Sequence, residues 1–115
     1  DFLMHGQEFA TAVQYRLPLI VVLLDNGMYG TIRMHQEREY PHRVSGTALQ
    51  NPDFAAYARA FGGHGERVER TDDFAPALAR LREQAQATRL PVLLHCLIDS
   101  EAITPNRSLS QIRGD

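Results

Sequence analysis

The strongest constraint on the fold is an uninterrupted apolar run, LIVVLL, at residues 19–24. The run is partly β-branched and does not alternate with polar residues, which predicts a strand buried on both faces. Such strands lie in the middle of parallel sheets that helices cover. The polar triplet Asp25-Asn26-Gly27 follows the run directly, so the fold has to place this triplet at the end of a buried strand.

The triplet has two possible interpretations. Asp or Asn followed by Gly between apolar runs is the signal of a hairpin turn, because a type I′ turn needs positive φ at both central residues. The same residues could instead end a parallel strand and face the ligand crevice of an α/β sheet. The segment that follows, Tyr29–Arg38, has a helical pattern with Ile32 and Met34 or His35 facing inward and Glu37 and Arg38 outward. A helix after the triplet favours the second interpretation.

Helices and apolar strands alternate along the rest of the chain. We expect helices over 7–15 and 29–38, a helix that Asn51-Pro52-Asp53 starts and that reaches Phe61, and a helix over 74–86 capped by Thr71-Asp72-Asp73. Strands are expected over 19–24, 66–69 and 91–98, and a loop over 41–52. This order predicts an α/β fold, a layered domain with a mainly parallel sheet flanked by helices. Residues 1–115 are expected to form one domain, with 99–115 as a surface tail.

Composition excludes several classes of protein. The net charge is −2, and the twelve cationic residues, all Arg, give no basic field for nucleic acid. No apolar stretch reaches the length that a membrane span needs. The single cysteine, Cys96, excludes a disulfide framework and is compatible with a reducing compartment. Its neighbour His95 points to the opposite face of the expected strand, so the two cannot form a catalytic dyad.

The triplet and the next residues carry the candidate chemistry. Asn26 offers an amide oxygen, and the chain after Gly27 can present a backbone carbonyl, which together suit a hard cation such as Mg²⁺. The helix that starts near Tyr29 adds amide groups that can face a phosphate. Gly30 lets a ligand approach the backbone closely. From the residues alone, a metal and phosphate site and an ordinary strand-to-helix turn both remain open.

The block DFLMHGQEFATAVQYRLPLIVVLLDNGMYGTIR resembles the carboxyl-terminal, diphosphate-binding domain of thiamine diphosphate enzymes of the acetolactate synthase, benzoylformate decarboxylase and pyruvate oxidase group. Their signature is Gly-Asp-Gly, roughly two dozen residues, then Asn-Asn. Asp25-Asn26 matches its second half, with Asp in place of the first Asn. Asp1-Phe2 resembles the pair that follows Gly-Asp-Gly. We therefore expect the first half, with its metal-binding aspartate and the first strand of the fold, just upstream.

The resemblance implies roles for seven residues. It assigns Mg²⁺ binding to the Asn26 side chain and the Met28 carbonyl, cofactor binding to Asp1, Tyr29, Gly30 and Thr31, and a contact on the substrate side to His5. The resemblance continues through NPDFAAYARAFGGHGERVE and AITPNRSLSQIR.

The implied parent protein is a cytoplasmic, homo-oligomeric enzyme that uses thiamine diphosphate and Mg²⁺ to decarboxylate or carboligate a small 2-keto acid. A pyrimidine-binding domain, with the activating glutamate, would come from outside this chain and from a second subunit, so the isolated chain is expected to be inactive. One alternative is a non-catalytic interaction or regulatory module of the same fold. Another phosphate-binding α/β protein, such as a nucleotide enzyme, lacks support because neither G-x-G-x-x-G nor G-x-x-x-x-G-K-[ST] occurs.

Overall fold

The computed structural model describes residues 2–115, which fall into two compact units. We call the part up to Leu24, together with Pro52–Leu97, the sheet unit. The remainder, Asp25–Asn51 and Ile98–Asp115, is the turn unit. Within the described residues no helix is long and apolar enough to cross a membrane.

The sheet unit is built on three strands. In chain order its elements are α1 (Phe2–His5), the 3₁₀ helix η1 (Gly6–Glu8), α2 (Phe9–Gln14), β1 (Ile20–Asp25), α4 (Phe54–Ala60), β2 (His64–Val68), α5 (Thr71–Thr88) and β3 (Val92–Leu97). The strand order is β1-β3-β2, and β2 runs parallel to β3 with Gly65 opposite Leu93. On the other side of β3, the Val92 N–H donates to the Leu19 carbonyl at 2.8 Å. The predicted α/β fold with a parallel sheet is confirmed.

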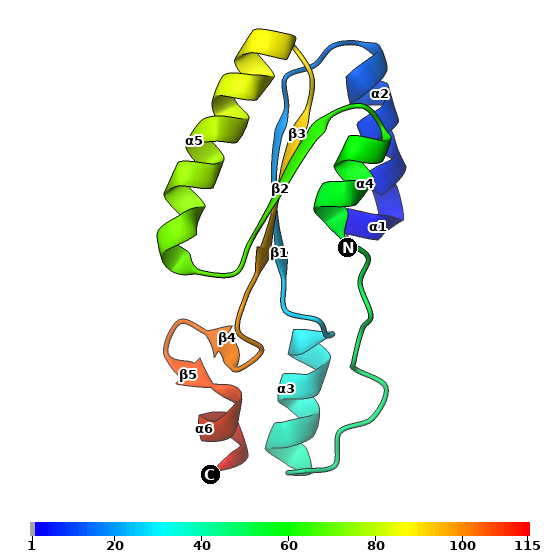
Figure 1. Ribbon diagram of the computed structural model, residues 1–115. Helices are drawn as coiled ribbons and strands as arrows, with labels where there is room; N and C mark the ends of the chain where they lie inside the picture. The colour runs from blue at the N-terminus through cyan, green and yellow to red at the C-terminus, as the bar shows by residue number, and fades with distance from the viewer. Residues whose placement is uncertain (1) are drawn as a thin grey trace. The chain divides into compact units, whose positions relative to one another are not determined.

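Two apolar cores cover the two faces of this sheet. Helix α5 lies on one side of the strands, and α1, α2 and α4 lie on the other (Figure 1). The α5 core contains Val68, Ala77, Leu81, Ala85, Val92, Leu94 and Cys96, and the opposite core contains Phe9, Leu23, Phe54, Ala58 and Leu93. Each fully buried leucine contributes about 1.5–3 kcal/mol.

His95 and Cys96 lie on opposite faces of β3, as predicted. Cys96 belongs to the α5 core, where burial raises the pKa of its thiol. His95 packs edge-on against Phe54 at 5.1 Å between ring centroids, and its Nδ1 accepts the Phe54 N–H at 3.3 Å. Both side chains therefore have structural roles at positions that exclude a dyad.

The two apolar strands differ in burial, and the prediction of two-sided burial is wrong for β1. Val92 to Cys96 are all buried. In β1, Ile20, Val22 and Leu24 are 43, 44 and 64% exposed. β3 is the central strand of the order β1-β3-β2, whereas β1 is an edge strand. Helix α5 packs on β2 and β3.

Several helices begin at other residues than predicted. The expected helix over 7–15 begins with a 3₁₀ turn, and α2 starts only at Phe9. The expected cap Thr71-Asp72-Asp73 lies inside the first turn of α5, whose N-cap is Arg70. Asp72 and Asp73 are still favourable there, because carboxylates stabilise the positive end of a helix dipole. In α4 the N-cap is Asp53, whose side chain accepts the Ala56 N–H at 3.0 Å.

The turn unit contains α3 (Gly30–Glu39), the strand pair β4 (Ala102–Thr104) and β5 (Arg107–Ser108), and α6 (Leu109–Arg113). The segment 99–115, expected as a surface tail, thus has its own secondary structure. Ser108 and Gln111 form a capping box that starts α6. Leu109 is fully buried, so this segment supplies core as well as surface.

We predict that Gly65→Ala destabilises the protein by about 2 kcal/mol, because the new methyl group overpacks the contact between β2 and α4. Its Cβ would lie 2.8 Å from the Ala55 Cα and 2.9 Å from the Ala55 carbonyl carbon, both backbone atoms that cannot rotate away. Urea denaturation measures the change. Arg67→Ala, at an exposed position of the same strand, is the control, and an equal shift in both variants would contradict the prediction.

Candidate functional site

The Asp25 carboxylate shapes the turn that leaves β1. Asp25 is only 8% exposed, and its Oδ1 accepts the Gly27 N–H at 2.9 Å and the Asn51 side-chain amide at 2.7 Å. Gly27 has a φ of +67°, a conformation that glycine adopts without steric cost. The turn is followed by α3, not by a hairpin strand. The interpretation of the triplet as a strand end is therefore confirmed.

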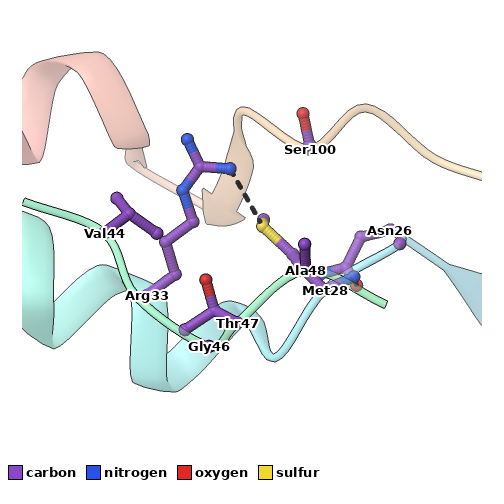
Figure 2. Close-up of a pocket in the computed structure, with 9 residues that line it drawn as sticks. Asn26, Met28, Arg33, Val44, Gly46, Thr47, Ala48 and Ser100 are labelled. Carbon is purple, nitrogen blue, oxygen red and sulfur yellow. Dashed lines mark hydrogen bonds between the residues drawn. The ribbon is translucent and has the colours of Figure 1, made fainter. Parts of the chain in front are cut away.

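Asn26 and Met28, the two predicted metal ligands, line one pocket of about 420 Å³ in the turn unit (Figure 2). The Asn26 Oδ1 accepts the Met28 N–H at 3.2 Å. An amide oxygen has a second lone pair, so this bond leaves acceptor capacity on Asn26.

The Met28 carbonyl takes no part in the short ladder that holds its segment. Met28 is paired with Ala48 in an isolated antiparallel bridge. The two ladder bonds flank this pair: the Tyr29 N–H donates to Thr47 O, and the Leu49 N–H donates to Gly27 O, both at 2.8 Å. In such a non-hydrogen-bonded pair, neither residue uses its own carbonyl for the ladder.

Gly30 provides the space in which the Asn26 side chain lies. A Cβ at position 30 would come within 2.8 Å of the Asn26 Nδ2 and 3.3 Å of the Ile103 Cδ1. Any larger residue would have to move the amide. Gly30, predicted to let a ligand approach the backbone, also makes room for Asn26.

This donor set fits a hard divalent cation that keeps other oxygen ligands. Mg²⁺ is typically held by one or two protein groups, with water and phosphate oxygens completing its octahedron. Among residues 2–115 there is no group of three or more His, Cys, Asp or Glu side chains that could hold a metal ion. The candidate ligands on the described part of the chain are therefore neutral oxygens, to which a diphosphate would add anionic ones.

The other predicted site residues have different positions. Tyr29, Gly30 and Thr31 form the N-cap and first two residues of α3, where helix amides lack intrahelical acceptors. The Tyr29 N–H is already bonded to Thr47, so the amides of the next two residues are the better candidates for an anion. His5 is an exposed residue at the end of α1, in the sheet unit. Asp1 lies outside the described residues.

Three residues that were not predicted as site residues, Arg33, Thr47 and Ser100, also line the pocket. Arg33 extends from α3 with Nη1 3.7 Å from the Met28 Sδ (Figure 2). Its Nε is buried without a hydrogen-bond partner. The position of Arg33 one turn after Gly30 was a usable signal, since both face the same side of a helix. No feature of the neighbouring sequence indicates that Thr47 or Ser100 lines this pocket.

The prediction that Glu37 faces outward is wrong, since Glu37 is 1% exposed. Its carboxylate accepts the His42 N–H at 3.1 Å and contacts the guanidinium groups of Arg113 at 3.2 Å and Arg33 at 3.5 Å. Burial alone would raise the pKa of Glu37, but the His42 bond and the two arginines lower it below its usual value. Ile32, expected inside, is 53% exposed. The apolar pattern of the helix does not show the partners of Glu37, and these partners allow its carboxylate to be buried.

Comparison with known proteins gives one family and several relatives. Residues 1–96 match the family described as "Thiamine pyrophosphate enzyme, C-terminal TPP binding domain". The chain is 40% identical over 100 residues to the acetolactate synthase isozyme 2 large subunit of Escherichia coli, covering 86% of this chain and 18% of that protein. It is 35% identical over 119 residues to the putative thiamine pyrophosphate-containing protein YdaP of Bacillus subtilis, covering 98% and 19% respectively. The chain thus spans about a fifth of the length of these relatives.

We predict that Glu37→Gln lowers stability at neutral pH and that the loss shrinks in acid. The lowered pKa of Glu37 means that its stabilisation is complete above the ordinary glutamate pKa of about 4.3 and disappears as the pH falls through the lower folded value. Urea midpoints of wild type and variant, measured from neutral pH down to pH of about 3, should converge. A difference that stays constant over this range would show that the buried group is not held ionised.

Proposed function

This chain belongs to the thiamine pyrophosphate enzymes, as their C-terminal cofactor-binding domain, and from this premise we propose that it binds thiamine diphosphate through Mg²⁺ held by Asn26 and Met28. The observation that carries the proposal is the arrangement at the pocket. Asn26 and Met28 both line it, the Met28 carbonyl is excluded from the flanking ladder, and Gly30 leaves room for the Asn26 amide.

Each residue of the turn has one task in this proposal. The Asn26 Oδ1 and the Met28 carbonyl bind the metal ion, and the first-turn amides of α3 at Gly30 and Thr31 receive the anionic diphosphate. Tyr29, a half-exposed residue at the start of the helix, covers the cofactor. When bound, thiamine diphosphate supplies the carbanion-stabilising chemistry, while the protein binds and orients it.

We further propose that the parent protein is acetolactate synthase-like and decarboxylates or carboligates a small 2-keto acid. The support is the similarity to the acetolactate synthase isozyme 2 large subunit of E. coli, at 40% identity. In this proposal His5 contacts the substrate side of the cofactor. A pyrimidine-binding domain outside this chain and a second subunit complete the site. The parent protein is then a cytoplasmic homo-oligomer. The isolated chain is then inactive, because it holds the diphosphate anchor and no activating glutamate.

We predict that Asn26→Ala weakens Mg²⁺-dependent binding of thiamine diphosphate to the full-length protein at least tenfold, about 1.4 kcal/mol, because one metal ligand is removed. Isothermal titration with the cofactor, at saturating and at zero Mg²⁺, measures this. Asn106→Ala is the matched control, since Asn106 is an exposed loop residue.

The outcomes separate the candidate functions. A tenfold loss in the Asn26 variant alone supports the metal site. A wild-type protein that binds no thiamine diphosphate would contradict the proposal and favour a non-catalytic module of the same fold.

We predict that Gly30→Ala weakens cofactor binding without lowering the stability of the protein. Alanine favours a helix over glycine by about 1 kcal/mol, which offsets local crowding, but its methyl group displaces the Asn26 amide. Thermal unfolding and the same titration measure the two effects separately. Unchanged affinity would show that the observed position of Asn26 is unimportant for binding.

A further inference from the structure

Two consecutive residues of α3 hold the loop that follows the helix. The Glu37 Oε2 accepts the His42 N–H at 3.1 Å. Gln36 pairs with the Ser45 backbone in both directions, donating to its carbonyl at 2.9 Å and accepting its N–H at 3.1 Å. The start of the loop over 41–51 is therefore fixed to the end of the helix.

The later part of the same loop holds the segment of the proposed metal ligand. Thr47 accepts the Tyr29 N–H, and Leu49 donates to the Gly27 carbonyl, each at 2.8 Å. Met28 thus lies between two bonds to the loop, one on each side. The direction of the Met28 carbonyl depends on the path of the loop, because rotating this peptide would break one of the two bonds.

A second connection runs through side chains. Arg33 contacts the Met28 Sδ with Nη1 at 3.7 Å and the Glu37 Oε1 with Nη2 at 3.5 Å. Arg113 of α6 approaches the same Glu37 oxygen at 3.2 Å. Glu37 thus bonds the loop, Arg33 and α6 together.

Stability alone is a weak explanation for this buried carboxylate. Burying two charges is costly, and apolar replacements of buried ion pairs are often equally stable. A carboxylate of α3 that bonds the loop, α6 and an arginine of its own helix does fix their relative geometry. We propose that Glu37 is a positioning residue: it holds the loop over 41–51 and Arg33 so that the Met28 carbonyl faces the metal ion. This inference rests on the metal site proposed above.

The test uses Glu37→Ala in the full-length protein and two readouts. The first is hydrogen exchange of the peptides that cover residues 26–31 and 42–51. The second is the affinity for Mn²⁺ in the presence of thiamine diphosphate, since Mn²⁺ accepts the same oxygen ligands as Mg²⁺ and is detected by electron paramagnetic resonance. We expect faster exchange in both segments and about tenfold weaker Mn²⁺ binding, as for other residues that orient metal ligands.

Three further variants separate positioning from general damage. Glu39→Ala removes an exposed carboxylate from the same helix and should change neither readout. Leu81→Ala opens a cavity in the α5 core of the sheet unit and lowers overall stability without touching the loop. Glu37→Gln keeps an acceptor for the His42 N–H, so it should restore part of the Mn²⁺ affinity.

The inference is overturned if exchange in the two segments is unchanged in Glu37→Ala, or if Leu81→Ala weakens Mn²⁺ binding as much. A wild-type protein without Mn²⁺ or cofactor binding would instead defeat the proposed function and, with it, the metal-orienting role. The exchange data would then show separately whether Glu37 holds the loop.

Discussion

Within four residues the chain has to leave an extended strand and enter a helix, and the Asp25 carboxylate makes this change of direction possible. It is nearly buried and bonds to the Gly27 N–H and to the Asn51 side chain. A carboxylate bonded to a backbone N–H two residues on stabilises a tight turn. Because this turn is fixed, Asn26 and Met28 line one pocket and α3 starts directly beyond them. The family pattern has Asn at position 25, and Asp supplies an equivalent acceptor.

The turn unit is held by carboxylates where the sheet unit is held by apolar packing. Glu37 bonds a loop amide and two arginines, and Glu101 accepts both the N–H and the hydroxyl of Ser110, which lowers the pKa of Glu101. Charged hydrogen bonds are directional, so they specify positions more narrowly than apolar contacts do. A segment that orients oxygen atoms toward a metal ion benefits from this kind of scaffold.

Local periodicity predicted most of the elements, because the spacing of apolar residues is a property of each segment by itself. The strands, the helix after the turn and the opposite faces of His95 and Cys96 followed from it. Periodicity failed for Glu37, whose partner Arg113 lies 76 residues away, and for β1, where no local signal shows which face a helix covers. For the site, Asn26 and Met28 followed from a family resemblance, and their metal-binding role stays a prediction.

The sequence by itself determined that an apolar strand ends in a polar turn and continues as a helix, since both patterns are local. It also determined the family, through the motif around Asp25-Asn26. Only the tertiary structure decided which atoms surround the turn: the ladder that leaves the Met28 carbonyl free of cross-strand bonding and the burial of Glu37 against distant arginines. The physical reason is that contacts between segments far apart in sequence depend on the path of the whole chain, which no single segment encodes.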